Sequence, residues 1–172
     1  PPAPDPQQHH ALSCLRPVTG CREQFLARLD WLSNKDVLDI PGLRRAGWQQ
    51  LLSLAEFEHL FSWLHFTPQQ LQRVPGISEK RAQQLWHHFQ LSHQQPLQRW
   101  VKALGVPLPT VALNALPDRN WQQLLARDEA SWRLLPGIGT GLATRIVQFL
   151  HHDEVRQLIT FLQQEPGEGG GD

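Results

Sequence analysis

The chain has 172 residues, enough for one domain or two small ones with a real core, and its formal net charge is zero. No apolar run is long enough to span a bilayer and no signal peptide is visible, so we expect a cytoplasmic protein. The zero charge hides an uneven distribution, because residues 66–127 carry seven basic and two acidic side chains, whereas residues 128–172 carry three and seven. Such a distribution indicates a polarised surface, although solvated helix faces would give the same counts.

Helical periodicity runs along the whole chain and strand-like alternation is rare, so we predict an all-α fold. The Pro-rich residues 1–11 predict a linker, and with the absence of methionine they lead us to expect a piece of a larger protein. Residues 163–172, rich in Gly and Glu, predict a disordered tail. Between these ends, apolar residues recur at helical spacing in six stripes: Phe25, Leu26, Leu29 and Leu32; Trp48, Leu51, Leu52 and Ala55; Ala82, Leu85, Trp86 and Phe89; Trp121, Leu124 and Leu125; Leu142, Ala143, Ile146, Val147 and Leu150; Val155, Leu158, Ile159 and Leu162.

Several helix starts can also be predicted. Thr67-Pro68-Gln69-Gln70 combines an N-cap, a proline at the first helical position and a capping-box glutamine. Asp118, Asp128 and Asp153 are predicted N-caps of three later helices.

Four stretches of the chain align with one another: IPGLRRAGWQQLL (40–52), VPGISEKRAQQLW (74–86), LGVPLPTVALNAL (104–116) and LPGIGTGLATRIV (135–147). Their anchoring glycines, Gly42, Gly76, Gly105 and Gly137, are 34, 29 and 32 residues apart. A unit that recurs at this period is an internal repeat, here a short helix, a glycine turn and a second helix. We refer to these as the first to fourth glycine turns.

A glycine turn before a helix suits an anion. The first amides of a helix have no partners and carry partial positive charge, and a turn without side chains lets a phosphate approach them in a contact that reads no base. We predict that the turn glycines, the amides after them and nearby basic side chains bind phosphate. These residues are Gly76, Ile77, Ser78, Lys80 and Arg81 at the second turn, Gly137, Ile138, Gly139, Gly141 and Arg145 at the fourth, and Gly42, Arg44 and Arg45 at the first.

The apolar residues of the turns have a structural role in this interpretation. Ile77 and Ile138 are predicted plugs that pin the second and fourth turns to the core. The third turn has prolines at 107 and 109 where amides should donate, so we expect it to be structural. For any single turn, the alternative that Pro-Gly merely joins two helices stays open.

The repeated apolar-Pro-Gly-apolar turn resembles the helix-hairpin-helix motif, which grips DNA phosphates without sequence preference. Four such turns within residues 12–162 resemble the tandem helix-hairpin-helix domain of bacterial NAD-dependent DNA ligases. The divergent second type of this enzyme is the one that fits the order and spacing of the cysteine pair Cys14 and Cys21, the hairpins and Trp100-Val101-Lys102-Ala103-Leu104-Gly105. The resemblance implies a DNA-binding domain over 36–162, built of two double-hairpin halves at roughly 36–95 and 96–162. It also implies a monomer that holds nicked duplex DNA from the minor-groove side, and a monovalent cation at the carbonyls of a turn.

The same resemblance implies NAD, Mg²⁺ and a lysine in a Lys-x-Asp-Gly motif for joining a 3′-OH to a 5′-phosphate. Lys35, Lys80 and Lys102 all lack this context. We therefore expect this segment to bind neither cofactor, to be inactive by itself, and to position the duplex for another lobe.

In those ligases a four-cysteine zinc module precedes the hairpins, and residues 12–35 resemble a degenerate form of it. Cys14 and Cys21 match one cysteine pair, but two thiolates do not complete a tetrahedral zinc site, and His9 and His10 lie in the Pro-rich segment. Two cysteines are also too few for a disulfide framework. We expect this segment to be held by apolar packing around Leu12, Leu15, Val18 and Phe25.

Three other functions stay open. A base-excision glycosylase would need a catalytic aspartate after a hairpin; Asp153 lies at a suitable distance but is better explained as an N-cap. A non-enzymatic DNA-binding or repair-scaffold module would carry the same hairpins. A helical protein–protein adaptor would respond to neither salt nor DNA.

Overall fold

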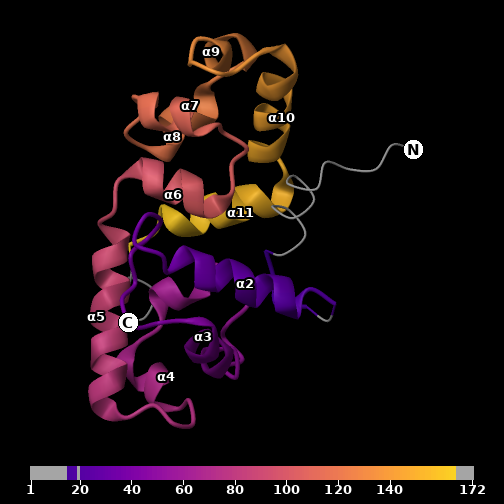
Figure 1. Cartoon of the computed structure of the whole chain (residues 1–172). Coiled ribbons are helices and arrows are strands. Elements are labelled where there is room, and N and C mark those ends of the chain that lie inside the picture. Colours follow the sequence, from indigo (N-terminus) through magenta and orange to yellow (C-terminus); the bar gives the residue numbers. More distant parts are fainter. Residues whose placement is uncertain (1–14, 19, 166–172) are drawn as a thin grey trace. The chain divides into compact units, whose positions relative to one another are not determined.

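The computed structural model describes residues 15–18 and 20–165. These residues form ten α-helices, one 3-10 helix and no strand, which confirms the predicted all-α class for the described part of the chain (Figure 1). The chain divides into two compact units at Gln95–Pro96. Residues 15–95 are called the first unit below, and residues 96–163 the second unit. The predicted linker, residues 1–11, lies outside the described residues, as do residues 166–172 of the predicted tail.

The first unit contains α2 (Arg22–Leu32), α3 (Arg45–Leu51), η1 (Ser62–His65), α4 (Pro68–Gln72) and α5 (Glu79–His93). Aromatic rings fill its core, with centroids 5.7 Å apart for Trp48 and Trp63 and 5.0 Å apart for Trp63 and Phe89. The indole N–H of Trp48 donates to the hydroxyl of Ser33 at 2.8 Å, and that of Trp63 donates to the carbonyl oxygen of Leu60 at 2.8 Å. The large rings are therefore buried without leaving their polar atoms unpaired.

The second unit contains α6 (Leu97–Leu104), α7 (Thr110–Ala115), α8 (Trp121–Ala126), α9 (Glu129–Arg133), α10 (Thr140–Leu150) and α11 (Asp153–Leu162). Trp132 of α9 and Phe149 of α10 are fully buried in its core. The predicted stripe of α11 is buried along its whole length. Because α11 ends at Leu162, the predicted tail begins where the last helix stops.

Two of the four predicted N-caps are correct. The Thr67 hydroxyl accepts a hydrogen bond from the Gln70 amide in a complete capping box, and the Asp128 carboxylate accepts one from the Ser131 amide. The other two are wrong. His152, and not Asp153, caps α11, while Asp118 lies two residues before the true cap of α8 and is buried in an ion pair.

A few apolar residues depart from the predicted packing. Trp86 belongs to a predicted core stripe but is 36% exposed on α5. The stripe of α3 was extended too far, since the helix ends at Leu51 and Ala55 is exposed. Near the start of the described chain Leu15 is buried as predicted, whereas Val18 is 50% exposed. None of the described helices combines the length and hydrophobicity that crossing a bilayer requires.

Candidate nucleic-acid interface

Three of the four glycine turns share one backbone conformation. The φ angle is +76° at Gly42, +89° at Gly76 and +79° at Gly137, in the left-handed region that favours glycine. In each case the residue two positions later is extended, and the next helix begins three positions after the glycine. The flanking helices pack against each other, α2 with α3, α4 with α5 and α9 with α10. Three of the four aligned stretches therefore share the same local backbone geometry, from the glycine to the start of the next helix.

At the fourth turn, the start of α10 has no side-chain cap. Its N-cap is Gly139, and the first helical hydrogen bond runs from the amide of Ala143 to the carbonyl oxygen of Gly139 at 2.9 Å. The amides of Thr140, Gly141 and Leu142 thus have neither a helical acceptor nor a capping side chain in the described part of the chain. A Cβ atom at Gly139 or Gly141 would meet nothing within 4 Å, and neither residue has a positive φ angle. Neither backbone conformation nor packing requires these two glycines.

The second turn differs from the prediction at Ile77. The amide of Ile77 donates to the carbonyl oxygen of Val74 at 3.1 Å, so it closes the turn and does not face a ligand. The Ile77 side chain is half-buried, whereas Ile138 is buried. The predicted plug is therefore correct at the fourth turn and only partly correct at the second.

Helix α5, after the second turn, has a capped and charged start. The hydroxyl of Ser78 accepts a hydrogen bond from the amide of Arg81 at 3.1 Å. The amides of Glu79 and Lys80 come before the first helical hydrogen bond, and the Lys80 side chain is exposed. This helix start combines two amides with a lysine, whereas α10 presents amides alone.

The first and second turns contact each other. Nη2 of Arg81 donates to the carbonyl oxygen of Gly42 at 2.8 Å. In the other direction, a Cβ atom at Gly76 would lie 3.1 Å from Nε2 of Gln50, at the end of α3. Each turn therefore touches the helix that follows the other, which brings the two predicted phosphate sites of the first unit side by side.

The two arginines after the first turn are held in surface ion pairs. Nε of Arg44 lies 3.1 Å from Oδ1 of Asp30, and Arg45 pairs with Glu23. The side chain of Arg44 is 73% exposed, and exposed pairs of this kind are weak. Both arginines can therefore exchange their carboxylates for a phosphate at little cost.

The third turn is built differently from the others. Gly105, with φ +88°, caps the C-terminus of α6, and α7 begins only at Thr110. Residues of this turn lie against the fourth turn, because a Cβ atom at Gly137 would be 3.0 Å from Cγ1 of Val111 and 3.2 Å from Cγ of Pro109. The third turn thus packs against the fourth and supports it.

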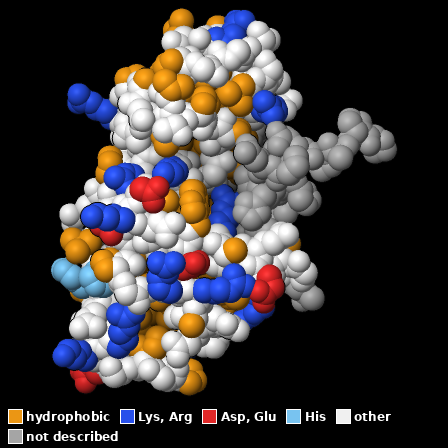
Figure 2. All heavy atoms as spheres, viewed as in Figure 1, with side chains coloured by type: hydrophobic (Ala, Val, Ile, Leu, Met, Phe, Trp, Pro, Cys, Tyr) orange, Lys and Arg blue, Asp and Glu red, His pale blue; other side chains and the backbone are white. Residues whose placement is uncertain are grey.

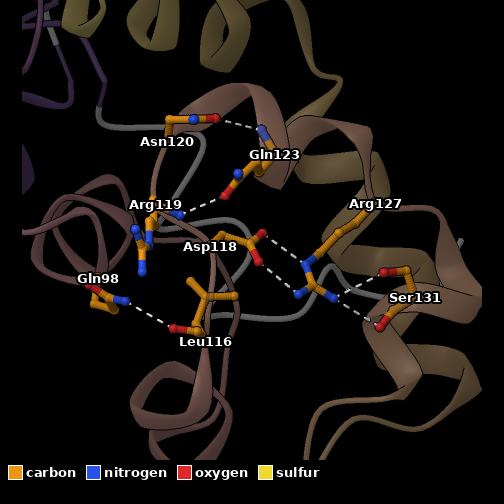
Figure 3. A network of polar contacts seen from close by, with 8 residues as sticks. All are labelled: Gln98, Leu116, Asp118, Arg119, Asn120, Gln123, Arg127 and Ser131. Carbon is orange, nitrogen blue, oxygen red and sulfur yellow. Dashed lines mark hydrogen bonds and ion pairs between the residues drawn. The ribbon is translucent and has the colours of Figure 1, made fainter.

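A buried ion pair also holds the fourth turn. Nη2 of Arg127 lies 2.7 Å from Oδ1 of Asp118, and its Nε donates to Oδ2 of Asp118 at 2.8 Å (Figure 3). Nη1 of Arg127 donates to the carbonyl oxygen and the hydroxyl of Ser131, at 3.1 and 3.0 Å. The guanidinium also lies 5.3 Å from the ring centre of Trp132. This network joins the segment before α8 to α9, the helix that leads into the fourth turn.

The surfaces of the two units differ in character. In the view of Figure 2, Lys and Arg side chains gather over α3 and α5 of the first unit. Over α7 of the second unit, hydrophobic side chains gather instead. Arg145 is exposed on α10 of that unit. The buried Asp118–Arg127 pair takes one basic and one acidic side chain of residues 66–127 out of the surface, so the basic excess of this segment is unchanged.

The sequence predicts no metal site, and the two cysteines are only weak candidates for metal ligands. Cys14 lies outside them, and Cys21 is half-buried at the N-cap of α2. No group of three or more His, Cys, Asp or Glu side chains comes together within the described ranges. No family model matches the chain.

Sequence reasoning missed two contacts that organise the site. The Arg81–Gly42 contact joins residues 39 positions apart, and nothing in the spacing of the repeat predicts it. The sequence did not predict the Asp118–Arg127 pair, because an aspartate shortly before a helix also fits the N-cap pattern.

Proposed function

We propose that this chain binds duplex DNA through its backbone phosphates, without sequence preference, and that its glycine turns act as helix-hairpin-helix motifs. The observation that carries the proposal is the pair Gly139 and Gly141, which the chain's own conformation and packing do not require. Gly139 is the N-cap of α10, where glycine is well tolerated, but at Gly141, in the first turn of the helix, glycine is less favourable than alanine by up to about 1 kcal/mol. Close approach of a phosphate to the uncapped amides of α10 would explain why both positions are occupied by glycine.

The first unit supports the same proposal by charge. Its two turns lie side by side, and the exposed side chains of Arg44 and Lys80 flank them. Each cation that replaces a counterion on a phosphate adds affinity that falls as salt rises. The two units would thus bind the DNA backbone in different ways, the first mainly through charged side chains and the second mainly through backbone amides.

We further propose that the chain is the DNA-gripping part of a bacterial NAD-dependent DNA ligase of the ligase B type, which seals nicks by joining 3′-OH and 5′-phosphate ends. The support is the order and spacing of the turns together with the 100–105 run. NAD and Mg²⁺ would act in another lobe of that enzyme, since this chain has no Lys-x-Asp-Gly motif. The protein would work as a monomer in the cytoplasm. A non-enzymatic repair scaffold with the same DNA-binding surface is the alternative.

Fluorescence anisotropy with two duplexes of unrelated sequence tests DNA binding. We expect similar affinity for both, and a slope of log affinity against log salt of about −4 to −5, for about four to six neutralised phosphates. A salt-independent affinity, or none at all, would contradict the proposal and favour a protein–protein adaptor. Incubating the chain with nicked duplex, NAD and Mg²⁺ then separates binding from chemistry, because we expect binding without sealing. Release of a base or cleavage at an abasic site would instead indicate a glycosylase.

A further inference from the structure

Leu134, at the end of α9, is unusually exposed for a leucine. Its exposed fraction is 84%, the highest of the large hydrophobic residues in the described ranges. It directly precedes the Leu135-Pro136-Gly137 turn, where the corresponding residue is Asp39 in the first turn and Arg73 in the second. The turn geometry therefore does not require an apolar residue at this position.

Two further apolar residues, Val111 and Pro109, lie at the turn that follows Leu134 in the sequence. Val111 is 53% exposed, and it lies against Gly137 together with Pro109. Apolar residues of α7 and of the segment before it thus lie at Gly137, three residues after Leu134, and Figure 2 shows hydrophobic side chains gathered over α7. We call Leu134, Val111 and Pro109 the apolar tip. A cluster of this kind calls for an explanation that a single exposed leucine does not.

The surroundings of the apolar tip indicate its partner. Directly after Gly137, α10 begins with the uncapped amides of residues 140–142. Directly before Leu134, the exposed Arg133 adds a positive charge. A lipid tail or an apolar protein surface would not use amides and a cation beside the tip. A nucleic acid would use both, because its phosphates border a groove whose walls are apolar sugars.

We propose that the apolar tip enters the minor groove of the bound duplex, and that Leu134 wedges at a base step whose stacking is already interrupted, as it is at a nick. This inference rests on the proposed DNA binding and adds a preference to it. Apolar wedges in the minor groove must separate stacked bases, which costs a few kcal/mol for each intact step. At a break in one strand much of that cost is absent, so the wedge favours broken over continuous duplex.

Leu134→Asn tests the wedge, with Leu91→Asn as the matched control. Both leucines are exposed, and Leu91, at 48%, belongs to α5 of the first unit and not to the apolar tip. Affinity for nicked and intact duplexes of one sequence is measured between 50 and 200 mM salt, with 2-aminopurine beside the nick to report unstacking. Thermal unfolding of both variants checks that they fold, which we expect because neither side chain is buried.

For the unsubstituted protein we expect about tenfold preference for the nicked duplex and a rise in 2-aminopurine fluorescence on binding. Leu134→Asn should lower affinity for the nicked duplex about five- to tenfold and abolish the fluorescence rise, while Leu91→Asn changes neither. Because an apolar contact releases no counterions, the loss should be the same factor at every salt concentration.

The inference and the proposed function fail in different ways. If Leu134→Asn binds nicked duplex as tightly as the unsubstituted protein, or if it changes the salt slope, the wedge is wrong while DNA binding stands. If the unsubstituted protein shows no salt-dependent DNA binding, both the proposed function and the inferred role of Leu134 are wrong.

Discussion

The guanidinium of Arg81 donates a hydrogen bond to the carbonyl oxygen of Gly42, with 2.8 Å between Nη2 and O. The start of α5 is thereby tied to the first glycine turn. Arg81 was predicted from sequence as a phosphate ligand, but this contact uses part of its donor capacity inside the protein. We therefore infer that it mainly positions the first turn beside the second.

Replacing Arg81 by methionine tests the positioning role. The substitution keeps much of the side-chain volume but removes the hydrogen bond, so we expect a loss of about 1 kcal/mol in the free energy of unfolding. DNA affinity should fall on every sequence, because the first turn loses its support. Urea unfolding and anisotropy measure the two effects. Lys80→Met is the control. Because Lys80 is exposed, its replacement should reduce the slope of log affinity against log salt by about one and leave the free energy of unfolding unchanged.

A glutamate at Gly141 should stabilise the protein and weaken its DNA binding. A side chain there meets nothing within 4 Å, and an acidic group in the first turn of α10 gains about 0.5 kcal/mol from the helix dipole. The same carboxylate would repel an approaching phosphate, so affinity should fall about tenfold or more. Gln122→Glu, exposed in the first turn of α8, adds the same charge to the same unit and should leave affinity nearly unchanged. Equal losses in both variants would point to net charge and not to the turn.

Valine at Gly137 should destabilise the second unit as well as weaken DNA binding. The residue has φ +79°, and its Cβ atom would lie 3.0 Å from Cγ1 of Val111. Strain and crowding together should cost about 2 kcal/mol or more, measurable as a lower melting temperature. Gly139→Ala is the cleaner test of phosphate contact, because its Cβ atom meets nothing within 4 Å.

Asp118→Asn should cost more stability than loss of a surface ion pair. Asp118 and Arg127 are mostly buried, and removing one partner leaves the other charge poorly compensated. We expect a loss of about 3 kcal/mol in the free energy of unfolding. Arg44→Gln, which breaks the exposed pair with Asp30, should cost less than about 0.5 kcal/mol. Similar losses in the two variants would show that the Asp118–Arg127 pair is no more than a surface contact.

Stability should fall as pH drops from 6.5 to 4, and His59 should be one cause. Burial, then the charges of Arg16 and His65, lowers the pKa of His59 to about 4. The unfolded chain therefore binds a proton in this range that the folded chain does not, so the stabilisation present above pH 6.5 is lost towards pH 4, by about 2 kcal/mol. In His59→Asn the amide oxygen can still accept the hydrogen bond from the Phe61 amide. The difference in unfolding free energy between pH 7.5 and 4.5 should be smaller in this variant, and an unchanged difference would exclude His59 as a source.

Local sequence patterns predicted the helical architecture well because they depend on neighbouring residues. Apolar spacing marked α2, α10 and α11, and Thr67 and Asp128 cap the helices assigned to them. Pro-Gly marked three of the left-handed turns, because glycine adopts a positive φ angle at the least cost.

What the sequence could not predict depends on contacts between distant residues. The stripe containing Trp86 has the right period for a buried face, but only the surrounding elements decide how wide that face is. Asp118 matched the N-cap pattern, and only the folded position of Arg127 shows that its carboxylate forms a buried ion pair instead. The amide of Ile77 was assigned to a ligand because spacing cannot show that Val74 accepts from it.

Only residues 94–96 separate the end of α5 from the start of α6. A tether this short, at most about 11 Å long, keeps a detached unit near any ligand that its neighbour still holds. The detached unit then rebinds faster than the protein can diffuse away, so two individually weak contacts give a long residence time on the ligand. In the proposed DNA complex, the short tether would let the two units release and rebind in turn, so that the protein stays bound without a single tight contact.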